Sequence, residues 1–240
     1  KPPPYGATGT APGDLWPWFT SEMAPALERA LAVANDASGS FESSLGGYAE
    51  ACRLNLDVLG KVLAHARAHL ERVWVDVLGR EAAASAWREL RRGSTLASLG
   101  GRAHAFFSVA PTWDVADTRT VRVPAGPFDL SESAARAAAR VLATLPSEVA
   151  ARLGDVAPAT HALFCLGEID DVYFARAQAA LAAAYARLAR AWGVAHTDLF
   201  FVPLADLRHA ARDADIRARW LPEVARQADA ARETRARQLL

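Results

Sequence analysis

The feature that most constrains the fold is a stripe of apolar residues between positions 52 and 77. Apolar side chains recur there at spacings of alternately four and three residues, at Cys52, Leu56, Leu59, Leu63, Ala66, Leu70, Val73 and Val77. Because an α-helix repeats every ~3.6 residues, this spacing predicts one long helix with a single apolar face. Such a face requires a second helix packed nearly parallel or antiparallel to it. The sequence "LGR" at 78–80 is expected to end the helix.

Helical patterns on both sides of this stripe predict an all-α fold. A helix is expected to begin near Ser21 and to be broken by "SGSFESSLGG" at 38–47. Further helices are predicted over 81–92, 133–145, 146–158 and 167–192, from Pro203 onward, and over the last 25 or so residues. Hydrophobic residues make up 52% of the chain, which is enough for a substantial core. The predicted architecture is a bundle of long helices, forming a single helical domain over residues 21–240.

Two segments depart from the helical pattern. Residues 1–20 combine a Pro/Gly-rich linker, "KPPPYGATGTAPG", with an aromatic loop that contains Trp16 and Trp18. Residues 111–130 contain alternating β-branched residues, prolines and a glycine, which predict a short extended or β-hairpin insert. The chain begins at Lys1 and not at methionine, so we expect it to be a piece of a longer protein.

Charge and composition narrow the function classes. The chain has 27 basic and 27 acidic residues, so no surface that tracks a nucleic-acid backbone is expected. No run of about 18 apolar residues exists, and the N-terminus lacks the apolar core of a secretory signal, so no membrane partner is expected. The cysteines, Cys52 and Cys165, lie in apolar helical patterns typical of buried thiols in a reducing compartment. We therefore expect a cytoplasmic protein, and the preference for arginine over lysine suggests a GC-rich bacterial genome.

The most unusual polar stretch is "GEIDDVYFARAQ" at 167–178. It is predicted to open a helix that runs from Gly167 to Trp192 and stops at Gly193. Glu168, Asp170 and Asp171 would lie in its first turn, where carboxylates complement the helix dipole. Three acids exceed what capping requires. Glu168 and Asp171 share a face with Gln178, so a polar line along the edge of a cavity is one interpretation, and a well-charged helix start is the favoured one.

Three other features were weighed as sites. His65 and His69 lie four apart, as metal ligands on one helix face do, but a polar edge beside the apolar stripe is favoured and no metal site is predicted. His104 follows a Gly-Gly turn in "GGRAHAFF", where a phosphate carrier is one interpretation and an ordinary helix start the favoured one. Trp16 and Trp18 are candidates for the wall of an apolar pocket. The sequence contains no nucleophile elbow, Cys/His pairing signature or phosphate-binding glycine loop, so no catalytic residue and no cofactor is predicted.

Residues 167–210 resemble the central helical region of phosphoenolpyruvate-utilising phosphotransferases, a group that contains phosphoenolpyruvate synthase-like proteins and rifampin phosphotransferases. The shared pattern is an acid-rich helix start, Arg-x-Gln, a long helix ending in glycine, an Asp-hydrophobic-Phe-Phe segment, and an acidic-Leu pair. It is carried by Glu168, Asp170 or Asp171, Arg176, Gln178, Gly193, Asp198, Phe200, Phe201, Asp206 and Leu207.

The resemblance implies a helical domain or subunit that binds the small organic substrate of an ATP-dependent phosphotransferase. The 240 residues contain neither an ATP-grasp nor a phosphohistidine domain, so a partner domain or subunit would supply both functions. The residues expected to contact the substrate are Trp16, Trp18, His104, Glu168, Asp171, Arg176 and Gln178. Two alternatives remain open, a stand-alone helical lyase or transferase with a cavity in its bundle, and a purely structural or interaction bundle.

Overall fold

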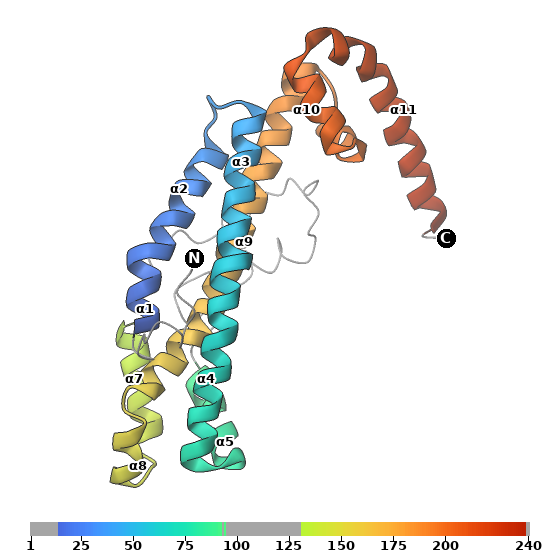
Figure 1. Ribbon diagram of the computed structural model, residues 1–240. Coiled ribbons are helices and arrows are strands. Elements are labelled where there is room, and N and C mark those ends of the chain that lie inside the picture. The colour runs from blue at the N-terminus through green and yellow to red at the C-terminus, as the bar shows by residue number, and fades with distance from the viewer. Residues whose placement is uncertain (1–13, 93, 95–130, 239–240) are drawn as a thin grey trace.

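The computed structural model describes residues 14–92, 94 and 131–238, and these ranges contain helices and no strand (Figure 1). The predicted all-α class is therefore confirmed. The linker at 1–13, His104 and the insert predicted at 111–130 lie outside the described residues. The helices are α1 (Leu15–Trp18), η2 (Phe19–Met23), α2 (Ala24–Asn35), α3 (Phe41–Cys52), η3 (Arg53–Leu59), α4 (Gly60–Leu78), α5 (Arg80–Arg91), α7 (Ser131–Leu142), α8 (Ser147–Arg152), α9 (Val156–Trp192), η4 (His196–Phe201), α10 (Leu204–Arg212) and α11 (Ala214–Gln238).

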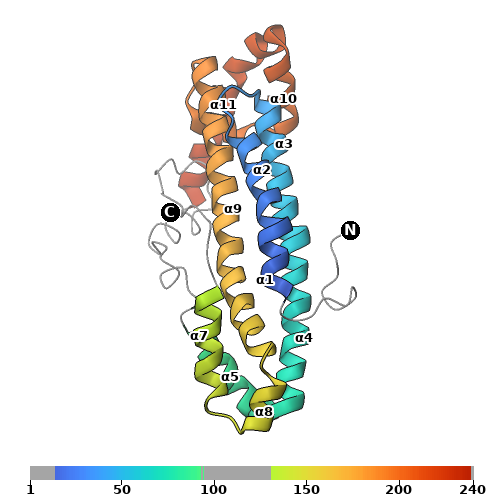
Figure 2. The same ribbon diagram turned by 90° about the vertical axis from the view of Figure 1, so that its left-hand side faces the viewer.

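The centre of the bundle is an antiparallel pair of long helices. α3, η3 and α4 follow one another without a break from 41 to 78, and this long helix lies beside α9 in both views (Figures 1 and 2). Going along the first helix, each residue contacts a partner that lies progressively earlier in α9. The hydrogen bonds join Ser44 to Arg187, Tyr48 to Gln178, Asn55 to Asp170 and Trp74 to Thr160. α9 is thus the antiparallel partner that the apolar stripe requires.

The apolar stripe itself changes face partway along the helix. η3 is a stretch of π-helix, whose i→i+5 hydrogen bonds accommodate an extra residue and rotate the following side chains relative to the preceding ones. Leu56, which the even spacing assigned to the stripe, is consequently 58% exposed, while Leu54, Asn55 and Leu59 are buried. The assignment of Leu56 to the buried face was therefore wrong. Beyond η3 the buried residues follow the ordinary helical repeat, at Val62, Ala66, Leu70 and Trp74.

α2 and α3 approach each other closely at a glycine. The predicted break at 38–47 is confined to the turn before Ser40, which caps α3 by accepting a hydrogen bond from the backbone N–H of Ser43 at 3.1 Å. Gly47 therefore lies inside α3, and a Cβ atom there would come within 2.4 Å of the backbone nitrogen of Ala34. The absence of a side chain at Gly47 allows the two backbones to meet.

α9 is much longer than the sequence pattern predicted. It begins at Val156 and not at Gly167, and it ends where expected, at Gly193, which adopts the left-handed conformation with φ 69°. The acids around position 170 therefore lie in the middle of a helix. Their predicted placement in the first turn, with its favourable dipole interaction, was wrong.

The N-terminal helix also begins earlier than predicted. α1, η2 and α2 form a continuous helical stretch from 15 to 35, so Trp16 and Trp18 lie in a helix and not in a loop. A second π-helical segment, η2, joins α1 to α2. Alanine-rich and leucine-rich sequence supports helix throughout this region, since these residues have the highest helix propensities.

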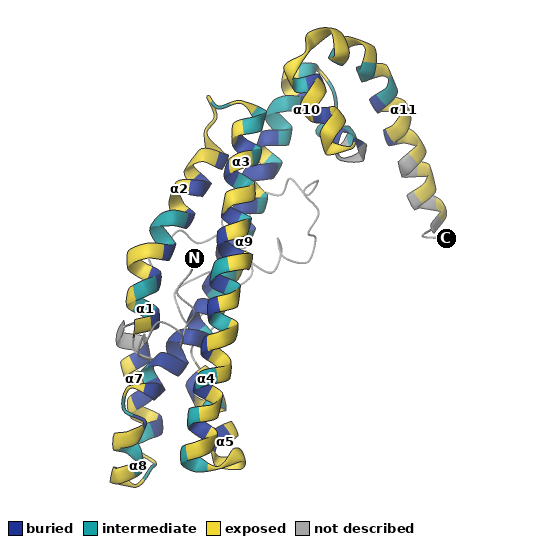
Figure 3. Ribbon diagram, in the orientation of Figure 1, coloured by how far each residue is buried: buried dark blue, intermediate teal, exposed yellow. Residues whose placement is uncertain are grey.

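Buried residues fall into two clusters. The larger occupies the middle and one end of the bundle and includes Leu27, Leu70, Trp74 and Leu166. The smaller lies where η4, α10 and the start of α11 cover the C-terminal end of α9, and is built from Ala189, Leu199, Val202, Leu207 and Val224. Figure 3 shows the burial along α9, while α11 extends away from the bundle. None of the helices in the described ranges combines the length and apolarity needed to cross a membrane.

Candidate functional site

A buried polar contact lies at the centre of the antiparallel pair, and we call Asn55, Asp170 and Asp171 the central polar site. Asn55 is 2% exposed, and its Nδ2 donates a hydrogen bond to the backbone oxygen of Asp170 at 3.0 Å. The Oδ1 atoms of Asn55 and Asp170 are both buried, and neither has a hydrogen-bond partner. A buried acceptor without a partner costs on the order of 1–3 kcal/mol. A buried unsatisfied group calls for a physical explanation, and π-helical turns such as η3 are frequent at functional sites.

The electrostatics of the central polar site favour an uncharged or ligand-bound carboxyl. The pKa of Asp170 is raised to about 7, mainly by burial and to a smaller extent by the negative charge of Asp171, while the Asn55 side chain opposes the shift. Asp171 is exposed as a residue, but desolvation of its carboxyl group also raises its pKa. No ion pair joins either carboxylate to a cation in the described part of the chain. Two acidic side chains therefore lie side by side here without a counter-ion among the described residues.

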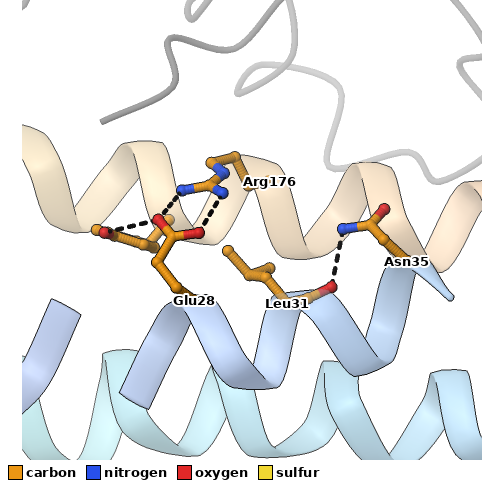
Figure 4. Close-up of polar contacts among 5 residues, drawn as sticks. Glu28, Leu31, Asn35 and Arg176 are labelled. Atoms are coloured by element: carbon orange, nitrogen blue, oxygen red, sulfur yellow. Dashed lines mark hydrogen bonds and ion pairs between the residues drawn. The ribbon is translucent and has the colours of Figure 1, made fainter. Parts of the chain in front are cut away.

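Arg176, predicted to orient a ligand, is instead bound to a carboxylate of α2. Its two terminal nitrogens contact the two oxygens of Glu28 at 2.6 and 2.7 Å, and Figure 4 shows this fork between α2 and α9. The hydroxyl of Tyr173 donates to the same carboxylate at 3.0 Å, and the guanidinium lies 5.2 Å from the centre of the Tyr173 ring. The guanidinium holds the pKa of Glu28 below its usual value. This arrangement ties α2 to α9.

Gln178 forms a second polar contact about two helical turns away from Asp170. Its Nε2 donates to the hydroxyl oxygen of Tyr48 at 3.1 Å, while its Oε1 is buried without a partner. Burial raises the pKa of Tyr48 to about 12, with a further contribution from the neighbouring Cys52 thiol. Eight residues of α-helix separate Gln178 from Asp170, or roughly 12 Å at ~1.5 Å per residue. The two contacts are thus separate points on one interface.

The remaining predicted residues lie apart from this interface. Trp16 and Trp18 are partly buried against the larger core cluster. Trp16 stacks on Phe19 with ring centres 5.5 Å apart, and Phe19 meets Tyr173 edge-on at 6.3 Å. Through Tyr173, which also donates to Glu28, this row of aromatic rings contacts the Glu28–Arg176 ion pair.

Glu168, Asp171 and Gln178 all lie on α9, and in the described part of the chain no hydrogen bond or ion pair joins them to one another. The charge of Glu168 contributes to raising the pKa of the Cys165 thiol, so Glu168 acts on the preceding turn of α9. Asp171 is exposed, and it is Asp170 that contacts the long helix from 41 to 78. His104 lies outside the described residues.

A buried histidine–cysteine pair escaped the sequence analysis. Nε2 of His161 lies 3.5 Å from Sγ of Cys165, and its Nδ1 lies 2.6 Å from the backbone oxygen of Leu90. Burial raises the pKa of the Cys165 thiol to about 12 and lowers that of His161. Both groups are therefore neutral at physiological pH, which suits an internal hydrogen bond and not a nucleophile with its base. Their i, i+4 spacing was the available signal, and placing the helix start at Gly167 hid it.

The histidine pair on α4 has no metal-site geometry. His65 is exposed, and its Nδ1 lies 2.7 Å from the backbone oxygen of Lys61. Among the described residues, no group of three or more histidine, cysteine or acidic side chains is arranged to hold a metal ion.

Comparisons of this chain with known proteins and structures found no match. No model of a protein family, no curated protein and no solved structure matches this chain. The resemblance of residues 167–210 to phosphoenolpyruvate-utilising phosphotransferases thus enters the functional argument only as a hypothesis.

Proposed function

We propose that this chain is the helical, small-molecule-binding region of a phosphoenolpyruvate synthase-like, ATP-dependent phosphotransferase. The ligand would be the organic substrate that accepts or donates the phosphoryl group. Nucleotide binding and the phosphohistidine relay would come from a partner domain or subunit. The isolated chain would therefore bind a metabolite without turning over ATP.

The central polar site is the observation that carries this proposal. Asn55 and Asp170 present two buried oxygen acceptors without partners, in the middle of the interface between the two long helices. A bundle without a ligand has no physical reason to retain them, because apolar residues of similar volume would be at least as stable there. The ligand is thus proposed to lie at the Asn55–Asp170 contact and not at Arg176.

The fold of the resembling segment is compatible with the proposal. Gly193 ends α9, and the segment after it folds back to bury Leu199 and Leu207 in the smaller core cluster. The second half of the resembling segment, from Gly193 to Leu207, therefore packs around the C-terminal end of α9, while its first half lies in the middle of that helix.

A structural or interaction bundle is the competing function, and the Glu28–Arg176 contact favours it. A residue expected to hold a ligand is there engaged in joining two helices, with the Arg176 side chain only 22% exposed. In that case the polar residues between the long helices would only hold the helices together and would bind no ligand.

A thermal-shift screen of the purified chain against polyketide-like and amino-acid-like metabolites tests the proposal. A ligand present at 100 times its dissociation constant stabilises the native state by about 2.7 kcal/mol, which raises the melting temperature of a chain of this size by several degrees. We expect such a shift in the natural chain and its loss in Asp170→Ala. The matched control is Asp57→Ala, which removes an exposed carboxylate from the facing helix.

Two results would count against the proposal. One is a complete absence of shifts across the screen, which favours the structural bundle. The other is hydrolysis of ATP by the isolated chain in the presence of magnesium, since the proposed region lacks a nucleotide-handling domain.

A further inference from the structure

We infer that the central polar site recognises a protonated amine of a small organic molecule. The ammonium group would donate hydrogen bonds to Oδ1 of Asn55 and Oδ1 of Asp170. This inference rests on the proposed small-molecule-binding function and specifies the chemistry of its ligand.

The free hydrogen-bonding groups of the site require a ligand that donates hydrogen bonds. Nδ2 of Asn55 is already committed to the backbone oxygen of Asp170, and a carbonyl oxygen can only accept. This contact fixes the orientation of the Asn55 amide and leaves its Oδ1 as the free group. The two unpartnered atoms are therefore both acceptors, and a group with several N–H donors satisfies them together. A ligand carboxylate or phosphate would add two more acceptors to the same place.

The charge of the site determines that the donor is a cation. Three cations on the flanking helices are paired with other acids: Arg53 with Glu50, Lys61 with Asp57 and Arg176 with Glu28. Asp170 and Asp171 are adjacent, and neither is paired with a cation in the described part of the chain. An ammonium group brings one positive charge and up to three donors into this uncompensated negative potential.

The surroundings favour an organic cation over a metal ion. No arrangement of three or more metal-ligating side chains exists among the described residues, whereas a divalent ion requires four to eight ligands. Asp171 is exposed and lies at the protein surface, while the Oδ1 atoms of Asn55 and Asp170 are buried. Leu54 and Leu166 belong to the apolar core cluster on the same two helices, which suits a ligand with an apolar body.

A matched pair of probes tests the inference. Cyclohexylmethylamine and cyclohexylmethanol have the same shape and differ in the charge and donor number of one group. Isothermal titration of the full chain at pH 8 should show the amine binding at least about tenfold more tightly than the alcohol. Asp170→Asn keeps the shape of the side chain and should reduce this ratio to near one.

The control is Asp57→Asn, which makes the same charge change at an exposed carboxylate two residues from Asn55 and should preserve the preference. Equal binding of the two probes, no binding of either, or loss of the preference in both variants would overturn the inference. In those cases the site is filled by water or by a proton on Asp170. The metabolite screen decides the proposed function separately, because a neutral ligand that shifts the melting temperature would uphold that function while this inference failed.

Discussion

Asp170 is the residue whose environment is least compatible with its chemistry. A carboxylate costs free energy when it leaves water, and the described part of the protein offers Asp170 no cation and leaves one of its oxygens unpaired. Its pKa rises to about 7 as a result. The residue is therefore a source of instability that a ligand or a proton relieves.

This cost predicts that Asp170→Asn stabilises the protein. The amide avoids the burial of a charge, so we expect the free energy of unfolding at pH 8 to rise by about 1–3 kcal/mol. Chemical denaturation of the two proteins at pH 8 measures the difference. A destabilised variant would show that the carboxylate is satisfied in a way the structure does not reveal.

The same substitution has a defined pH dependence. The folded-state pKa of about 7 exceeds the usual value of 3.8, so between pH 4 and 7 the folded protein binds more protons than the unfolded chain. The contribution of Asp170 to stability is then fully present below pH 4 and is lost as the pH rises to 7. The advantage of Asp170→Asn should therefore grow between pH 4 and pH 8. Because His161 and the other groups titrate in both proteins, the difference between the two curves isolates Asp170.

At the scale of elements, two adjacent glycines of α3 should respond in opposite directions to the same substitution. A Cβ at Gly47 meets the backbone of α2, with Ala34 N at 2.4 Å and Ala30 O at 2.8 Å, whereas a Cβ at Gly46 has no neighbour within 4 Å. Gly47→Ala should lower the free energy of unfolding by about 1–3 kcal/mol through overpacking. Gly46→Ala should raise it by about 0.5–1 kcal/mol, because alanine is the better helix former. Urea denaturation of both variants checks the signs.

The π-helical segment η3 makes a second prediction about an element. It contains one residue more than an α-helix of the same span, so deletion of the exposed Leu56 should convert it to α-helix and keep the flanking buried faces in register. We expect a folded protein with a small loss of stability. Deletion of the exposed Ala68 in α4 should instead rotate Leu70 and Trp74 by about 100° relative to the preceding turns and unfold the bundle. Circular dichroism melts compare the two deletions.

At the scale of the whole molecule, the smaller core cluster should unfold while the larger stays folded, but not the reverse. Leu70 and Leu207 are both completely buried, the first in the larger cluster and the second in the smaller. Replacement of either by alanine costs about 2–5 kcal/mol locally. Amide hydrogen exchange should show Leu207→Ala losing protection over 196–238 while 41–78 stays protected, and Leu70→Ala losing it throughout. Uniform loss in both variants would show a single cooperative unit.

Sequence reasoning correctly gave the features that depend on local chemistry. The helical repeat around Leu59, Ala66 and Leu70 predicted a long helix with an antiparallel or parallel partner. The glycines after Leu78 and Trp192 end their helices as expected, both with positive φ. These predictions succeed because side-chain periodicity and the conformational freedom of glycine are properties of a short segment.

The sequence did not predict where a helix starts, or which of its faces is buried, when these depend on the neighbouring helices. α9 continues to Val156 through "THALFCLGE", which lacks a single apolar face because helices contact it on several sides. The acids near Asp170 consequently looked like a helix start. The extra residue in η3 also broke the regular repeat, which concealed Asn55 among residues assigned to the exposed side.

The sequence by itself thus determined that the chain forms long helices and where several of them stop. Only the tertiary structure decided that Asn55 meets Asp170 across 115 residues of sequence, and that Arg176 is bound to Glu28. Periodicity specifies which face of a helix is apolar, but the polar residues that face each other depend on the axial register of two packed helices. That register is fixed by the packing of the whole interface, including the π-helical segment η3 and the close approach of α2 at Gly47. No local sequence pattern encodes it.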